Sequence, residues 1–329
     1  MRSWLIPVHC ATLLFIASFS ATSGEIRSLE RLIQTHENEI DLAAVKIAID
    51  ATIDPSTDAT AINEQLDALV AGIARRFPVG ASNRAKLDVL LSSLYQPGPW
   101  NDQHPFQYDL DDPFGKVLRN KLLSHYLATR KGNCVSMPVL VVILGQKLGL
   151  PVTLATAPEH LLVKYLDADG QWLNIEATAG GFKYDSSYAH ELGISPRATA
   201  NGIYLRPLGP RESAGAMLST VMEFHAIHGR QAQRIAVADL ALTVNPKDVM
   251  AMIHKGAAYY LLLQERYVSR YPDPADIPAA QRNDFQVISR ENLAWYAEAE
   301  ALGWKPPTKE QDANYLRNIQ RERSTRKGN

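Results

Sequence analysis

A cysteine, a histidine and a carboxylate follow one another in the chain as Cys134, His160 and Glu176. A thiol attacks an acyl carbon only as its thiolate, and it needs a base within hydrogen-bond reach to become one. A carboxylate behind that base fixes the imidazole tautomer and stabilises its charged form. We therefore take Cys134 as the candidate nucleophile, His160 as its base and Glu176 as the group that orients the base.

The residues around Cys134 predict that it lies at the start of a helix. An apolar run at residues 139–144 follows it, and Asn133 is a residue type that caps helix N-termini. Pro138 lacks an N–H and is tolerated only near the start of a helix, which independently places that start close to Cys134. There the helix dipole and the unpaired N–H groups favour a thiolate, and the Cys134 N–H can hold an oxyanion.

Extended segments rich in Val, Leu and Ile follow the helix and position the other two residues. They span residues 152–156, 160–166 and 172–175. Residues 167–170 predict a hairpin turn between the last two segments. Pairing residues 160–166 with 171–177 around this four-residue turn brings Glu176 opposite the start of the first strand, within reach of His160. A register shift of one residue would turn Glu176 to the other face of the sheet.

Each of the three residues also has an ordinary structural explanation. A single histidine at a strand start is more often a core or surface residue, a strand-end glutamate is usually solvated, and a lone cysteine can be buried and inert. A redox role for the thiol is a further alternative. The order cysteine, histidine, acid on helix start, strand and strand favours a nucleophilic site over these.

Two patterns resemble metal sites, and both are incomplete. His225 and His228 share one helix face but have no third ligand at a useful spacing. Residues 167–170 resemble part of a calcium loop, but strands flank them where the calcium motif has helices. The chain has no phosphate-binding glycine-rich loop, dinucleotide fingerprint or Gly-x-Ser-x-Gly elbow. We predict no metal and no cofactor.

The first residues have the features of a secretory signal. Arg2 precedes an apolar run from Trp4 to Ala21, and small residues at 21–23 are typical of a signal-peptide cleavage site. The run is short for a membrane anchor. We expect cleavage near Ser23, export to the periplasm and no stable membrane insertion afterwards. Removal of residues 1–23 would take away Cys10, leave Cys134 as the one thiol and exclude an internal disulfide.

The remaining sequence defines the organisation of the chain. The 34 basic and 35 acidic residues give a net charge of -1, which argues against a nucleic-acid partner. Residues 25–95 are helical with a break at residues 55–58, residues 96–113 form a loop, and a helix is expected from Phe114 to about Arg130. From Ala214 the pattern is helical again.

The C-terminal helices resemble tetratricopeptide units. Residues 241–246 and 255–260 match one unit. Residues 301–306 resemble part of that unit again, at a separation of about twice the usual repeat length. Such repeats commonly form a packed flank or a partner-binding groove, so a protein partner could bind the C-terminal helices.

Three segments around the candidate residues belong together, namely Arg130-Lys131-Gly132-Asn133-Cys134, Pro158-Glu159-His160-Leu161-Leu162-Val163 and Trp172-Leu173-Asn174-Ile175-Glu176-Ala177-Thr178. They resemble the transglutaminase-like, papain-type thiol core. More closely, the chain resembles the bacterial SirB-type proteins, which join that core to a tetratricopeptide tail. The resemblance implies a catalytic triad of Cys134, His160 and Glu176, although the family usually has aspartate at the third position. It also implies that part of the SirB-type family, which has lost the cysteine, is not catalytic.

These observations predict an α+β fold, with a helix packed on a small antiparallel sheet between two helical regions. The expected parts are a signal peptide at 1–23, a helical region at 24–110, a transglutaminase-like core at 111–212, a tetratricopeptide-like region at 213–320 and a disordered tail at 321–329. The expected function is a thiol hydrolase or acyltransferase acting on peptide or protein amides, with a non-catalytic scaffold as the alternative. Trp100, Gln103 and Gln107 are candidates for an additional oxyanion donor.

Overall fold

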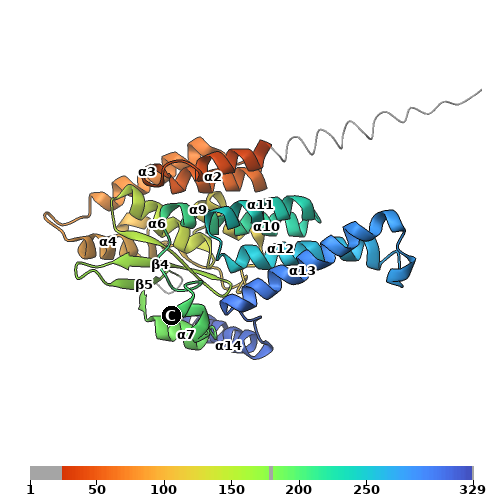
Figure 1. Ribbon diagram of the computed structural model, residues 1–329. Coiled ribbons are helices and arrows are strands. Elements are labelled where there is room, and N and C mark those ends of the chain that lie inside the picture. The colour runs from red at the N-terminus through yellow and green to blue at the C-terminus, as the bar shows by residue number, and fades with distance from the viewer. Residues whose placement is uncertain (1–23, 178–180, 328–329) are drawn as a thin grey trace, which may run out of the picture.

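The computed structural model describes residues 24–177 and 181–327 (Figure 1). The expected signal segment, with Cys10, lies outside the described residues. Among the helices of the described ranges, none has both the length and the apolar character needed to cross a membrane.

Helices precede the thiol segment, as predicted. They are the helix at residues 24–33, the 3-10 turn η1 (Glu37–Glu39), α2 (Leu42–Ile53), α3 (Ala59–Ala74) and α4 (Asn83–Tyr95). The side chains of Asp41, Asp58 and Ser82 accept hydrogen bonds from backbone N–H groups in the first turns of α2, α3 and α4. The predicted break at residues 55–58 is confirmed, and a second break separates α3 from α4.

The segment between α4 and the thiol is more irregular than the sequence indicated. It contains η2 (Pro99–Asn101), β1 (Gln107–Tyr108), η3 (Leu118–Lys121), α5 (Leu123–Thr129) and β2 (Lys131–Gly132). The single helix predicted from Phe114 to Arg130 is wrong, because Gly115 has a positive φ of 60° and Leu122 is extended. Helix α5 begins at Leu123, whose N–H donates to the buried carboxylate of Asp50. Strands β1 and β2 pair in parallel, which ties Tyr108 to Gly132, two residues before Cys134.

A four-stranded antiparallel sheet follows helix α6 (Ser136–Lys147) and confirms the α+β class. Its order is β3 (Val152–Ala157), β4 (His160–Leu166), β5 (Trp172–Glu176) and β6 (Gly181–Lys183). Helix α6 lies between the sheet and helices α2 and α3, and its residues from Ser136 to Gly145 are all buried (Figure 1). Strand β6 has no counterpart in the sequence prediction.

The other face of the sheet packs against a second apolar cluster. Leu162 on β4 contributes to it together with residues of α7 (Asp185–Glu191), α8 (Pro196–Ala200), α12 (Val249–Leu263) and α13 (Arg282–Leu302). The sheet is therefore covered by α6 on one face and by later helices on the other. His160 and Leu162 project from the same face of β4, because side chains alternate along a strand.

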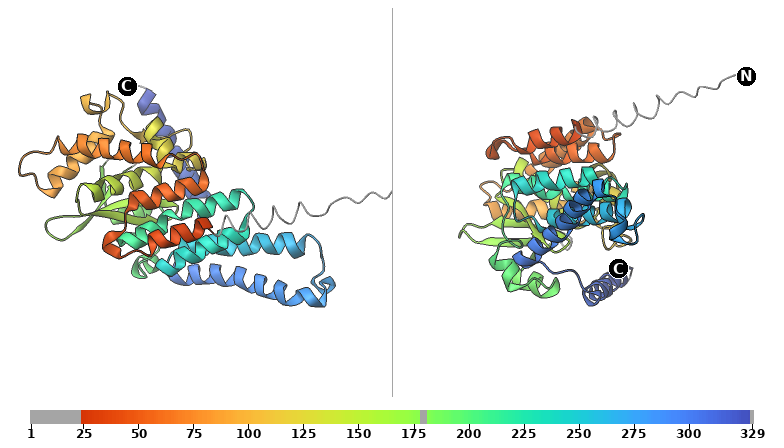
Figure 2. Two further views of the ribbon diagram at one scale, coloured as in Figure 1. Left: turned by 90° about the horizontal axis from the view of Figure 1, so that it is seen from above. Right: turned by 45° about the vertical axis from the view of Figure 1, so that its right-hand side comes forward.

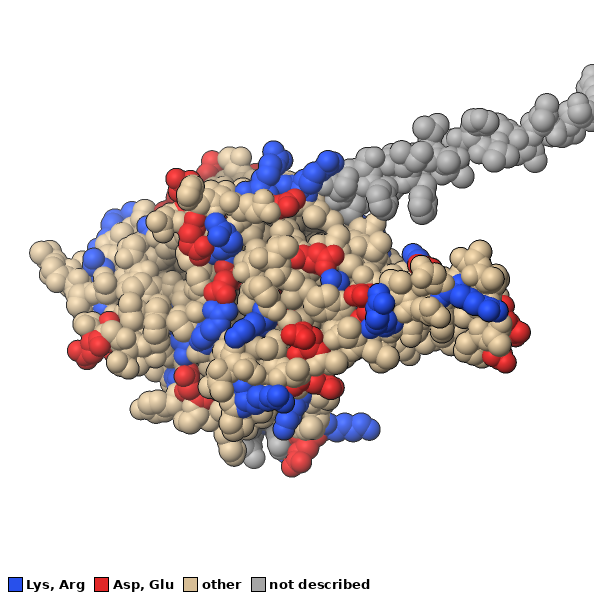
Figure 3. Space-filling model, viewed as in Figure 1, with Lys and Arg blue, Asp and Glu red and all other residues tan. Residues whose placement is uncertain are grey.

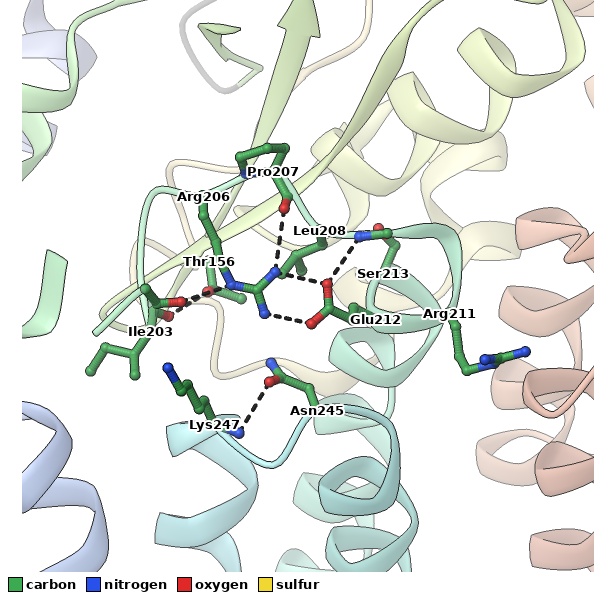
Figure 4. A network of polar contacts seen from close by, with 12 residues as sticks. Thr156, Ile203, Arg206, Pro207, Leu208, Arg211, Glu212, Ser213, Asn245 and Lys247 are labelled. Atoms are coloured by element: carbon green, nitrogen blue, oxygen red, sulfur yellow. Dashed lines mark hydrogen bonds and ion pairs between the residues drawn. The ribbon is translucent and has the colours of Figure 1, made fainter. Parts of the chain in front are cut away.

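A polar network joins the sheet to the C-terminal helices (Figure 4). Thr156 on β3 accepts a hydrogen bond from the Leu205 N–H and donates its hydroxyl to the Ile203 carbonyl. Arg206 pairs with Glu212, whose carboxylate also accepts from the N–H of Gly209 at the start of α9. This segment thereby fixes the direction in which the helical tail leaves the sheet.

The tail consists of α9 (Pro210–Met217), α10 (Ser219–Ile227), α11 (Gln231–Val244), α12, α13 and α14 (Lys309–Lys327). Short turns η4 (Gln264–Val268), η5 (Pro274–Asp276) and η6 (Ala279–Gln281) connect α12 to α13. Helices α12 and α13 lie side by side and extend away from the sheet (Figure 2). Helix α14 continues through residues 321–327, where the sequence analysis expected disorder.

Charged side chains of both signs are interspersed on the face of the molecule shown in Figure 3. This mixture agrees with the nearly balanced numbers of acidic and basic residues.

Candidate thiol site

Cys134 lies in the turn that leads into α6. The side-chain oxygen of Asn133 accepts hydrogen bonds from the N–H groups of Val135 (3.0 Å) and Ser136 (3.2 Å), and its carbonyl accepts from the Met137 N–H. The Asn133 side chain therefore satisfies N–H groups of the turn that leads into α6, but the N-cap of α6 is Val135, two residues after the predicted one. The thiol remains partly exposed, and its sulfur lies 3.7 Å from the Glu159 carbonyl oxygen.

A strained turn holds the thiol against the sheet. Pro158 and Glu159 connect β3 to β4, and Glu159 has a positive φ of 53°. The Leu161 N–H, one residue beyond His160, donates to the Cys134 carbonyl at 3.3 Å. The turn thus places the first residue of β4 directly beside the cysteine.

Replacing Glu159 by glycine should relieve this strain. A left-handed conformation costs a side-chain-bearing residue roughly 1 kcal/mol, and glycine adopts it freely. We expect Glu159→Gly to be more stable than Glu159→Ala by about 1 kcal/mol in urea unfolding, because both variants lack the carboxylate and only alanine keeps the strain. Equal stability of the two variants would show that the turn stores no strain.

His160 and Glu176 meet on one face of the sheet. The Nε2 atom of His160 lies 3.2 Å from Oε2 of Glu176, and the two side chains are 17% and 10% exposed. Burial alone would lower the pKa of His160, but the Glu176 carboxylate and the hydrogen bond with Cys134 outweigh it and raise this pKa to about 10. The imidazole therefore carries its proton at neutral pH, between the carboxylate and the thiol.

The strand register differs by one residue from the predicted one. Leu166 pairs with Trp172 and Val163 with Ile175, so the turn has five residues rather than four. Continued by one step, this register sets Glu176 opposite Leu162, on the face that also carries His160. The predicted pairing would have set Glu176 opposite Leu161, on the other face.

Tyr188 on α7 completes this arrangement and was not predicted. Its hydroxyl donates to Oε2 of Glu176 at 2.6 Å, the same oxygen that contacts His160. Tyr188 is 1% exposed, and burial followed by the nearby Glu176 charge raises its pKa well above the usual value. No spacing pattern in the sequence relates Tyr188 to the other three residues, because α7 follows a strand that was itself not predicted.

Two further tyrosines lie near the sulfur. The hydroxyl groups of Tyr108 and Tyr315 are 3.0 Å apart, and both contact the Pro113 carbonyl oxygen, at 2.8 and 2.6 Å. Burial and then the charge of Cys134 raise the pKa of Tyr108. Burial raises the pKa of Tyr315 as well, and Cys134 and Glu176 add to the increase. Tyr108 comes from β1, whereas Tyr315 comes from α14 at the other end of the chain.

Two cavities open at the thiol. The larger, about 620 Å³, lies between the β3–β4 turn and helices α10 and α12, and the smaller, about 490 Å³, lies between the segment after α7 and helix α14. Cys134, Glu159 and His160 line both. Both volumes are in the range that holds drug-sized ligands, so the thiol lies at the junction of two ligand-sized spaces.

The structure does not bring the proposed oxyanion side chains to the thiol. Trp100 stacks under the guanidinium of Arg76 at 3.6 Å, and Trp100, Gln103 and Gln107 are absent from the lining of both cavities. Tyr108, the neighbour of Gln107, approaches Cys134 instead, because side chains on the two-residue strand β1 point to opposite faces.

The two metal-like patterns do not assemble into ligand sets. His225 is buried on α10, while His228 is exposed and its Nδ1 contacts the Phe224 carbonyl. Asp167 accepts hydrogen bonds from the N–H groups of Asp169 and Gln171, as in an ordinary hairpin turn. Within residues 24–177 and 181–327, no group of three or more His, Cys, Asp or Glu side chains is placed to hold a metal ion.

A cysteine at a helix start that faces a histidine and an acid on adjacent antiparallel strands defines a transglutaminase-like thiol domain. The comparison with family models agrees, since residues 60–219 match the transglutaminase-like superfamily. The chain therefore carries a domain of this superfamily, and that domain includes Cys134, His160 and Glu176.

Two relatives are each described as "UPF0162 protein", from Xylella fastidiosa strains Temecula1 / ATCC 700964 and 9a5c. Each is 25% identical over 198 residues, which cover 56% of this chain and 67% of the relative. Among solved structures, menin aligns over 89% of this chain and 88% of its own, with 13% identity and a TM-score of 0.35. A TM-score this low does not indicate a shared fold.

Proposed function

We propose that this protein is a thiol hydrolase or acyltransferase that acts on amide bonds of peptides or proteins through an acyl-enzyme on Cys134. The observation that carries the proposal is the meeting of Cys134 and His160 where two cavities join, with Glu176 in contact with the imidazole. The superfamily match supports it by including all three residues. Export to the periplasm, the SirB-type assignment and the tetratricopeptide nature of the tail remain predictions from the sequence.

Each group has a role in this proposal. The Cys134 thiolate attacks the amide carbonyl, a C–S bond forms, and the carbonyl electron pair moves onto oxygen. The Cys134 N–H at the start of α6 can donate to that oxyanion. As the C–N bond breaks, the His160 imidazolium gives its proton to the departing amine, and Glu176 keeps the ring oriented.

The acyl-enzyme can then react with either of two acceptors. His160, now neutral, removes a proton from water or from a second amine, which attacks the thioester and releases the thiolate. Water gives hydrolysis, and an amine gives acyl transfer. In both cases the thiolate and imidazolium are restored.

Alkylation of native protein with iodoacetamide tests the proposal. A thiolate paired with an imidazolium should react much faster than the unfolded chain at pH 7, and His160→Ala should slow the reaction by about 10- to 30-fold. The exposed His228 offers a matched control, since His228→Ala should leave the rate unchanged. Labelling of the native protein no faster than that of the unfolded chain would refute a catalytic thiol.

A second assay separates the two reactions. Casein is incubated with the protein and a fluorescent primary amine. New amino termini on casein would indicate hydrolysis, whereas covalent attachment of the amine would indicate transfer. Cys134→Ser should abolish either product.

A non-catalytic scaffold is the second candidate, and one observation favours it. Helices α12 and α13 expose large apolar side chains that could contact a protein partner. They include Tyr260, Leu261, Val287 and Leu293, of which Leu293 is 67% exposed. A slow, His160-independent labelling rate in the iodoacetamide experiment would favour this alternative.

A further inference from the structure

The second cavity at the thiol has a wall that lies outside the transglutaminase-like domain. The family match ends at residue 219, yet helix α14 lines the cavity of about 490 Å³ with Gln311, Asp312 and Tyr315. The opposite wall comes from the segment after α7, including Leu192 and Gly193. A part of the chain remote from the nucleophile therefore shapes the space beside it.

Helix α14 is fixed to both rims of this cavity. At one rim, the Gln311 side chain lies so close to Gly193 that a Cβ there would be 2.2 Å from Gln311 Nε2. At the other rim, the Tyr315 hydroxyl contacts the Pro113 carbonyl at 2.6 Å, and its ring lies 5.4 Å from that of Phe114. The helix thus bridges the two sides of the cleft.

The start of α14 is also well defined. The Thr308 N–H donates to the Gln311 side-chain oxygen at 2.8 Å, and the Gln311 N–H donates to the Thr308 hydroxyl at 3.2 Å. This reciprocal cap satisfies two N–H groups at the beginning of the helix. Tyr315, two turns further on, consequently has a defined position relative to the cavity.

The walls of the smaller cavity indicate what it would hold. Many of its side chains are rigid and apolar, namely those of Pro113, Phe114, Pro158, Pro306, Pro307 and Tyr315. Charged side chains of both signs lie among them, namely those of Glu159, Glu191, Lys305, Asp312 and Arg317. Such a mixed lining suits an extended polypeptide segment, which presents both apolar side chains and polar backbone groups.

We infer that α14 is a substrate-binding element: with the segment after α7 it forms a subsite for the polypeptide on one side of the scissile amide, while the larger cavity takes the other side. The inference rests on the proposed function and deepens it. The thiol lines both cavities, so a chain crossing Cys134 enters both. Tyr315 serves as a specificity-determining residue, because it holds α14 against the rim formed by Pro113.

Three alkylating reagents with the same reactive chloromethyl carbon test this inference. Chloroacetamide carries no peptide, acetyl-Phe-Ala-chloromethylketone carries its peptide on the acyl side, and chloroacetyl-Ala-Phe-amide carries it on the amine side. In each reaction the thiolate displaces chloride and forms a C–S bond. Peptide binding in either cavity therefore appears as a change in the alkylation rate of Cys134.

Tyr315→Ala is expected to lower the rate at which one of the two peptide reagents alkylates Cys134 by about tenfold. The rates with the other peptide reagent and with chloroacetamide should stay within about twofold of the native values. Leu192→Trp, which fills the same cavity from the opposite wall, should slow the same reagent. Met250→Trp, which fills the larger cavity, should slow the other. Leu316→Ala is the matched control on α14, because Leu316 is exposed and lies outside both cavities.

Two other results would overturn the inference. If Tyr315→Ala and Leu192→Trp slow both peptide reagents equally, or slow neither, α14 does not form a separate subsite. If the proposed function itself is wrong, a different result is expected: chloroacetamide would react no faster with the native protein than with the unfolded chain. Leu192→Trp keeps the test decisive if Tyr315→Ala disturbs folding.

Discussion

Glu176→Gln is expected to slow alkylation of Cys134 at pH 7 by about 10- to 30-fold, because a thiol without a charged partner is only a few per cent thiolate at this pH. The substitution keeps the size of the side chain but removes the charge that most raises the pKa of His160. Burial of the imidazole would then favour its neutral form, and the thiolate would lose its positively charged partner. The rate is measured with iodoacetamide, as a function of pH.

Two variants serve as controls for this prediction. Glu298→Gln removes an exposed carboxylate on α13 that lines neither cavity, so no change is expected. Tyr188→Phe removes one hydrogen bond to Glu176 and should give a smaller loss, about threefold. A rate for Glu176→Gln equal to that of the native protein would show that the carboxylate does not act on the site.

The stability of the protein should depend on the protonation of His160. The folded protein holds the proton with a pKa of about 10, compared with 6.5 for the ordinary histidine. The folded state therefore binds this proton more tightly than the unfolded state does. Its contribution is fully present below pH 6.5 and is lost as the pH rises towards 10.

We expect the native protein to have a higher free energy of unfolding than His160→Gln. This difference should decrease by about 2–4 kcal/mol as the pH rises over this range. Urea unfolding at intervals of pH measures the difference. Adding Cys134→Ser to both proteins should reduce the fall, because one of the groups that raise the pKa is removed. A difference that stays constant with pH would mean that His160 has an ordinary pKa in the folded state.

The sequence predicted the central parts of the site because local signals specify them. Asn133 and Pro138 locate the helix start, and segments rich in Val, Leu and Ile locate β4 and β5. The order of Cys134, His160 and Glu176 then suggested their meeting. The register was wrong by one residue, since it depends on a turn whose length is set by hydrogen bonds of Asp167 that composition alone does not reveal.

The tyrosines around the site could not be predicted for a different reason. Tyr108, Tyr188 and Tyr315 reach it from three separate elements, and their approach depends on tertiary packing. Helix α14 is also strongly polar, so its sequence gives no apolar stripe that would indicate a buried contact. Tyr188 donates to the carboxylate of Glu176 and so restrains a side chain that is one methylene longer than the aspartate expected from the family resemblance.

The short connection between α13 and α14 limits how far the C-terminal helix can travel. Residues 303–308 form a tether that spans at most about 20 Å when fully extended. A detached α14 would stay near the thiol at an effective concentration in the millimolar range. A substrate that can bind only when α14 has left the cavity would therefore compete with a helix at millimolar effective concentration. The same helix added as a separate peptide at micromolar concentration would have little effect.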